Sequence, residues 1–145
     1  MMSQKFSGFT LVELMLVLAI SGVLMSMTTG VWDPWLERQH LSQQIRMVRD
    51  ALAHAQLLAL TRLSSHQVRE DNQQIIIQAL GTSDNTRQVW ESLPEDIRIQ
   101  ATRWPSFSPS GFAAGGTLTL QSANYEVQIV VSPIGKIRQT EILPQ

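Results

Sequence analysis

A long apolar run near the N-terminus dominates the hydropathy pattern of this sequence. From Leu14 to Val31 there is no charged side chain, and most residues are Leu, Met, Val, Ile or Ala. Because a helix rises about 1.5 Å per residue, roughly 20 apolar residues span the hydrocarbon core of a bilayer. The run therefore predicts a helix long enough to cross a membrane.

A second, amphipathic helix is predicted directly after this run. Asp33-Pro34 is typical of a helix start, because Asp can accept hydrogen bonds from free N–H groups and Pro is tolerated in the first turn. Apolar residues then recur at spacings of four and three, which places them on one helical face: Leu41, Ile45, Val48, Leu52, Ala55 and Ala59. The small residues among them suit close approach of a sheet, and the helix should end near Leu63 to Ser65.

After Ser65 the pattern changes from helical to alternating, which predicts a β-rich domain. A turn is expected at 81–85 and a long irregular loop at 104–116. Strands are predicted at 74–80, 87–91, 97–101, 117–121, 125–132 and 137–142. One helix followed by about six short, mostly antiparallel strands indicates an α+β fold.

Length and composition limit the possible classes of protein. With 145 residues there is room for one anchor helix and one small globular domain. The absence of cysteine excludes a disulfide framework and a thiolate metal site. Residues 64–145 hold six Arg or Lys against eight Asp or Glu, a net charge of −2, whereas a DNA-binding surface usually has a basic surplus.

The segment from Gly8 to Glu13, which precedes the apolar run, carries an unusual acid. A carboxylate at the centre of a bilayer costs about 2.5 to 3.5 kcal/mol without a partner. Cleavage after Gly8 would create a positive amine on Phe9, and this amine of one subunit could pair with Glu13 of its neighbour. A secretory signal peptide has a shorter apolar region with a small-residue cleavage site after it, so it fits less well. A plain membrane anchor leaves Glu13 unexplained, and a buried core helix would seldom carry 18 uncharged residues in a row.

The sequence Gly8-Phe9-Thr10-Leu11-Val12-Glu13 resembles the processing site of type IV pilins and type II secretion pseudopilins. The resemblance implies that a prepilin peptidase cuts after Gly8 and methylates the new terminus at Phe9, and that Glu13 guides docking into a filament. Four further segments together resemble the GspH/FimT family of minor pseudopilins and minor pilins: Phe107-Ser108-Pro109-Ser110-Gly111, Thr117-Leu118-Thr119-Leu120, 127–132 and Gly135-Lys136-Ile137-Arg138.

This resemblance implies a pilin-like organisation of the chain. A leader peptide would occupy residues 1–8, a transmembrane or filament-core helix 9–31, an amphipathic helix 32–65 and a periplasmic β-domain 66–145. Lys5 precedes the span, whereas Asp33 and Glu37 follow it. Because cations favour the cytoplasmic side, the N-terminus should be cytoplasmic and the β-domain periplasmic, with a single pass through the bacterial inner membrane.

The implied function is that of a minor pseudopilin, a structural component at the tip of the periplasmic pseudopilus that helps to export folded proteins. Expected partners are the major pseudopilin, the other minor pseudopilins, the prepilin peptidase and secreted substrates; nucleic acid is not expected. The alternative is a FimT-like minor pilin of a type IV pilus that takes part in DNA uptake through Lys136 and Arg138.

The residue pattern offers no catalytic site, no metal site and no cofactor site, so an enzyme is not expected. The three histidines, His40, His54 and His66, lie too far apart to share a metal and are predicted to be solvated. Ser110 lacks the Gly-x-Ser-x-Gly context of a hydrolase. The glycines at 111, 115 and 116 lack the Lys-Ser/Thr ending of a phosphate-binding loop. They predict a flexible loop, with a partner-docking loop as the alternative.

Overall fold

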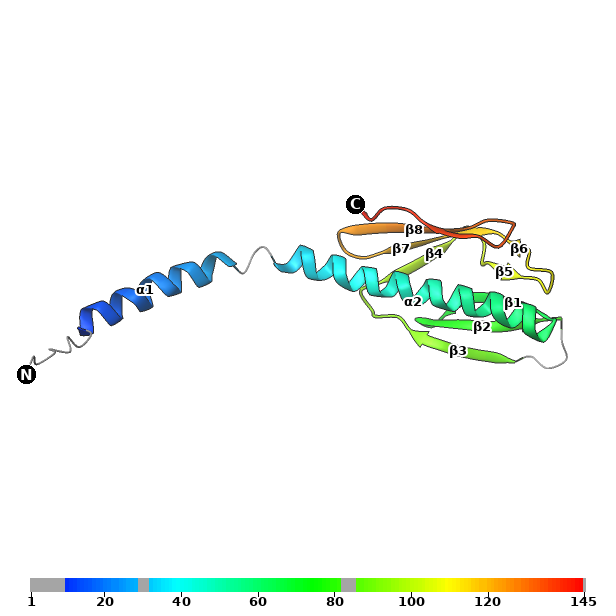
Figure 1. Ribbon diagram of the computed structural model, residues 1–145, viewed down its shortest axis with the longest axis horizontal. Coiled ribbons are helices and arrows are strands. Elements are labelled where there is room, and N and C mark those ends of the chain that lie inside the picture. The colour runs from blue at the N-terminus through cyan, green and yellow to red at the C-terminus, as the bar shows by residue number, and fades with distance from the viewer. Residues whose placement is uncertain (1–9, 29–31, 82–85, 145) are drawn as a thin grey trace, which may run out of the picture. The chain divides into compact units, whose positions relative to one another are not determined.

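The computed structural model describes residues 10–28, 32–81 and 86–144, which form two compact units (Figure 1). The first unit is Met1–Leu36 and the second is Glu37–Gln145. Gly8, Phe9, the last residues of the predicted membrane run, and the turn residues 82–85 lie outside the described residues.

The first unit is built around helix α1 (Leu11–Thr28). Its residues are mostly strong helix formers such as Leu, Met and Ala, and it contains neither a proline nor a charge after Glu13. Every large apolar side chain described between Leu11 and Met25 is at least half exposed, from 51% at Val17 to 77% at Met25. The unit therefore has no core of its own in its described part.

Helix α2 (Trp32–Arg62) supplies the apolar face that the sequence predicts. All six predicted face residues, from Leu41 to Ala59, are at most 1% exposed. Pro34 lies in the first turn, where its missing N–H removes no helical hydrogen bond. Leu63 follows the last helical residue with a φ of 51°, a left-handed conformation that ends the helix. The predicted buried face is confirmed, and the helix begins one residue before Asp33 and ends one residue before Leu63.

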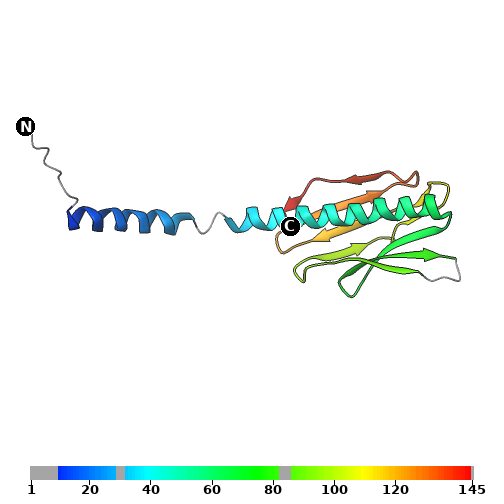
Figure 2. The ribbon, with the colours of Figure 1, turned by 60° about the horizontal axis from the view of Figure 1, so that its bottom comes forward.

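The strands form two antiparallel sheets, which α2 packs against (Figures 1 and 2). The first sheet has the order β3-β2-β1-β5-β6, and the second has the order β10-β8-β7-β4 with β9 also paired to β8. Their bounds are β1 Ser65–Asp71, β2 Gln74–Leu80, β3 Arg87–Ser92, β4 Arg98–Ala101, β5 Ser106–Phe107, β6 Ala113–Ala114, β7 Gly116–Gln121, β8 Tyr125–Val131, β9 Ile137–Gln139 and β10 Leu143–Pro144.

One hydrophobic core joins α2 to both sheets. Val68 and Ile77 contribute to it from the first sheet, and Leu118 and Ile129 contribute from the second. Each of these side chains is at most 1% exposed. The predicted α+β class, with a helix packed on a small antiparallel β-domain, is confirmed.

Five of the predicted strands form within one residue of their predicted bounds: β2, β3, β4, β7 and β8. The other strands differ from the prediction. Strand β2 has the predicted bounds, whereas β1 was not predicted, because its sequence is polar and only His66 and Val68 are buried. The predicted irregular loop at 104–116 contains β5 and β6 and buries Phe107 completely. Of the last predicted strand, 137–142, only β9 forms, and the unpredicted β10 follows just after it.

Candidate functional site

The first turn of α1 holds Glu13, the predicted assembly residue. The Glu13 backbone N–H lies 3.3 Å from the Thr10 hydroxyl oxygen and 3.1 Å from the Thr10 carbonyl oxygen. Thr10 therefore caps the helix, and Thr10-Leu11-Val12-Glu13 has the Thr-x-x-Glu pattern of a capping box. The capping role of Thr10 was not predicted, although its sequence pattern is visible.

The surface of α1 is apolar on all sides, and nothing in the described part of its unit covers it. A helix of this kind requires an apolar environment outside its own unit. Of the helices that the structure describes, none is long and apolar enough to cross a membrane.

Glu37 connects α2 to the hairpin between β7 and β8. Its carboxylate accepts hydrogen bonds from the Ser122 hydroxyl at 2.7 Å, the Asn124 backbone N–H at 2.9 Å and the Asn124 side-chain amide at 2.7 Å. These donors favour the charged form, so the Asn124 amide first, and then the Ser122 hydroxyl, lower the pKa of Glu37 below its ordinary value of 4.5. No local pattern indicates these contacts, because the partner residues lie 85 and 87 positions from Glu37.

Of the two candidate nucleic-acid contacts, Lys136 lies in the turn between β8 and β9, and Arg138 lies in β9. Both side chains are exposed, and Arg138 lies opposite Val130 in the β8–β9 pairing. Gly135 has a φ of +77°, and a Cβ there would lie 2.7 Å from the backbone oxygen of Gly111. The glycine of this motif therefore has a structural explanation: the chain needs a left-handed turn against a neighbouring loop.

The 104–116 segment is also shaped by backbone packing, which corrects the prediction of a flexible loop. A Cβ on Gly115 would lie 2.4 Å from the Val131 carbonyl oxygen, and one on Gly116 would lie 2.1 Å from the Arg103 carbonyl oxygen. No side chain larger than hydrogen fits at these positions unless the backbone shifts. The glycines therefore allow strands to approach closely.

The histidines do not gather, and the prediction that all three are solvated is wrong for His66. Its side chain is 3% exposed, and its Nδ1 lies 2.8 Å from the Ser64 carbonyl oxygen. His54 is partly buried against Trp90, with ring centroids 4.8 Å apart, whereas His40 is exposed. Within residues 10–28, 32–81 and 86–144, no three His, Cys, Asp or Glu side chains are grouped as metal ligands.

Two families match separate parts of the chain. Residues 3–29 match the prokaryotic N-terminal methylation motif, and residues 44–135 match the type II transport protein GspH. These matches include the predicted processing site and most of the β-domain, and they do not favour the FimT-like alternative. No functionally curated protein matches the sequence.

Two solved structures of a minor pseudopilin, EpsH of the Vibrio cholerae type 2 secretion system, share the fold. The first is 18% identical, with a TM-score of 0.53, and the match covers 69% of this chain and 94% of that chain. The second is 16% identical, with a TM-score of 0.50, and the match covers 68% and 90%. With the fold of these structures and a family match over most of its length, the chain belongs to the GspH family of type II transport proteins.

Proposed function

We propose that this GspH family member is a minor pseudopilin of a type II secretion system and a structural, non-catalytic component of the periplasmic pseudopilus. The observation that carries the proposal is the presence, in one chain, of an N-terminal methylation motif and a GspH domain. The motif supplies a processed, apolar helix for assembly, and the domain supplies the surface that other subunits contact. The resulting filament would help folded proteins to leave the periplasm.

Processing is proposed at Gly8 and Phe9. The prepilin peptidase would cleave between them and methylate the Phe9 amine. Phe9 would then be the new N-terminus, two residues before the start of α1 at Leu11. The proposed partners are this peptidase, the major pseudopilin, the other minor pseudopilins and secreted substrates.

Membrane orientation follows from the distribution of charge around the first helix. Lys5 would keep the leader in the cytoplasm, and the acids Asp33 and Glu37 would follow the span on the periplasmic side. We therefore place the protein in the bacterial inner membrane as a single-pass protein, with residues 66–145 in the periplasm before assembly. A periplasm-specific reporter joined after Gln145 should be active, and activity only of a cytoplasm-specific reporter would contradict this orientation.

Glu13 would pair with the Phe9 amine of an adjacent subunit. The substitutions Glu13→Gln and Thr10→Ala separate this role from helix capping, because glutamine retains the capping-box pattern but loses the charge. We expect Glu13→Gln to be cleaved normally but to assemble poorly, and Thr10→Ala to weaken the cap yet still assemble. Normal recovery of Glu13→Gln in sheared pseudopili would refute the proposed pairing.

Deletion of the gene tests the function as a whole. Extracellular release of secreted enzymes should fall to the level of a secretion-defective strain, while pilus-dependent motility and DNA uptake remain normal. Re-expression of the full chain should restore release. Loss of motility or uptake with normal release would instead assign the protein to a type IV pilus.

A further inference from the structure

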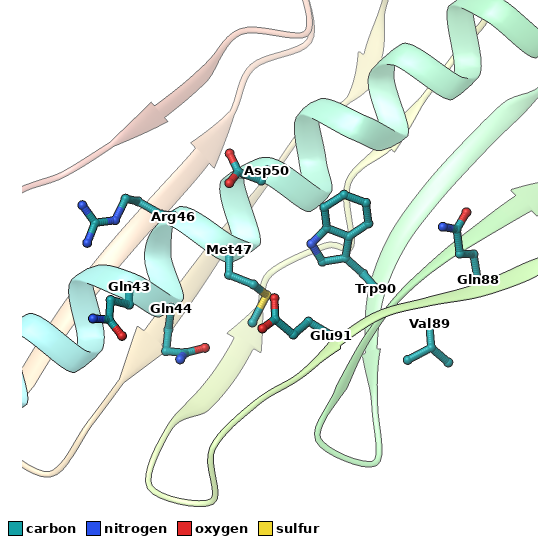
Figure 3. Close-up of a pocket in the computed structure, with 9 residues that line it drawn as sticks. All are labelled: Gln43, Gln44, Arg46, Met47, Asp50, Gln88, Val89, Trp90 and Glu91. Atoms are coloured by element: carbon teal, nitrogen blue, oxygen red, sulfur yellow. The ribbon is translucent and has the colours of Figure 1, made fainter.

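A groove of about 680 Å³ runs between α2 and strand β3 (Figure 3). Gln44 and Met47 line it from the helix, and Trp90 and Glu91 line it from the strand. In Figure 3 the Trp90 ring points towards α2, and the Met47 and Glu91 side chains point towards one another. The groove therefore has an apolar part at Met47 and Trp90 and polar groups around it.

Strand β3 forms one edge of its sheet and, among the strands that the structure describes, pairs with β2 alone. The Ala79 N–H donates to the Thr86 carbonyl at 3.3 Å, and Gln88 lies opposite Ile77. In an antiparallel ladder, alternate residues direct their backbone groups to the partner strand, so Val89 directs its N–H and C=O outwards. Val89 is 49% exposed, and an unpaired edge of this kind can accept another strand.

If a further strand paired with β3, the side chains on one of its faces would enter the groove. Successive side chains of a strand point to opposite faces of a sheet, so every second residue of a segment paired with β3 would face α2. The walls of the groove are the flank of α2 and the edge strand itself. Apolar residues of the added segment would contact Met47 and Trp90.

Two observations indicate what this segment would carry. The Gln44 Oε1 atom is buried and has no hydrogen-bond partner among the described residues, so it can accept a hydrogen bond from a docked chain. Asp50 and Glu91 also line the groove, with Arg46 as the one cation there, and none of the three forms an ion pair within the described part of the chain. This acidic surplus favours a partner with a basic side chain and disfavours a second copy with the same surplus.

We propose that β3 and the α2 groove together bind an extended segment of a different pseudopilin, which adds to the sheet as a further strand. The segment has alternating apolar residues and at least one Lys or Arg close to Asp50 and Glu91. This inference rests on the proposed function, and it identifies the surface through which the protein contacts its neighbour.

Photocrosslinking of the full-length protein in secreting cells tests the inference. The photoreactive amino acid p-benzoylphenylalanine is placed at position 92, at the end of β3, or as a control at position 130, on the exposed face of the interior strand β8. Position 92 should crosslink to an extended segment of another pseudopilin, identified by peptide mapping, and position 130 should not crosslink to that segment.

Two variants show whether the contact is strand addition. Val89→Pro removes the outward N–H and should lower the crosslink yield at position 92 at least tenfold, whereas Val89→Ala retains the N–H and should stay within about twofold. Gln44→Met, in the helix, removes the buried acceptor and should lower the yield several-fold without lowering the unfolding temperature. It serves as the second test if Val89→Pro fails to fold.

The inference is overturned if position 92 crosslinks only to a second copy of this chain, only to a secreted substrate, or to no protein. A yield that is insensitive to both Val89→Pro and Gln44→Met also overturns it. These outcomes differ from failure of the proposed function: if secretion requires the gene but position 92 captures no pseudopilin, only the docking surface is wrong. If secretion does not require the gene, the function itself is wrong.

Discussion

The contacts of Glu37 give a prediction whose size can be worked out from the structure. Its carboxylate accepts three hydrogen bonds of 2.7 to 2.9 Å, and these connect the start of the second unit to the β7–β8 hairpin. A hydrogen bond to a charged group contributes about 1.5 to 3 kcal/mol when buried, and less where water can replace it. Because Glu37 is half-buried, we assign about 0.7 kcal/mol to each bond, so Glu37→Ala should cost about 2 kcal/mol. For a domain of this size, that loss lowers the unfolding temperature by about 8 °C.

The effect should depend on pH in a defined direction. The pKa of Glu37 is lowered in the folded protein, so folding favours the carboxylate. Its contribution is fully present above the ordinary value of 4.5 and is lost as pH falls through the lowered pKa. The difference in stability between the natural protein and Glu37→Gln should therefore be largest near neutral pH and should shrink in acid.

Thermal unfolding of the full chain in a mild detergent, followed by near-ultraviolet circular dichroism at several pH values, measures this difference. Glu95→Gln is the matched control, because Glu95 is exposed and accepts no hydrogen bond from the described residues. A Glu37→Gln protein as stable as the natural one at neutral pH would refute the reasoning. A difference that does not change on acidification would refute the assigned role of the charge.

Two further predictions concern packing, and the same unfolding measurement checks both. Phe107→Ala should cost about 3 to 5 kcal/mol, because the ring is completely buried, whereas Phe112→Ala, at a side chain 61% exposed, should cost under about 1 kcal/mol; equal losses would contradict the burial of β5. Gly135→Ala should destabilise by more than about 2 kcal/mol, because a Cβ would meet the Gly111 backbone oxygen at 2.7 Å. Gly81→Ala has a similar positive φ but open space around it, so it should cost about 1 kcal/mol, and an equal loss at both glycines would argue against the close contact.

The elements that could be predicted from the sequence are those marked by a contiguous motif or a periodic pattern. The apolar face of α2 could be predicted because helical spacing alone brings Leu41, Ile45 and Val48 to one side. Strand β2 could be predicted because its run of three isoleucines lies between polar, turn-forming segments. The N-terminal methylation motif could be recognised from Gly8 to Glu13 because these residues form one short contiguous segment.

Contacts between distant segments were decided by the tertiary structure. Strand β1 has a polar sequence, and it becomes a central strand because β2 and β5 pair with it on either side. Glu37 gains its partners only when residues 85 and 87 positions away are folded beside it.

The difference between local motifs and contacts of distant segments also explains what the sequence could determine about function. Residues 8–13 lie within the N-terminal methylation motif, which is one linear segment and can be recognised without the fold. The α2–β3 groove, with Gln44 on a helix and Trp90 on an edge strand, exists only after the two elements pack together. Local chemistry is encoded by adjacent residues and can be predicted from them, whereas an interaction surface is formed by residues that only folding brings together.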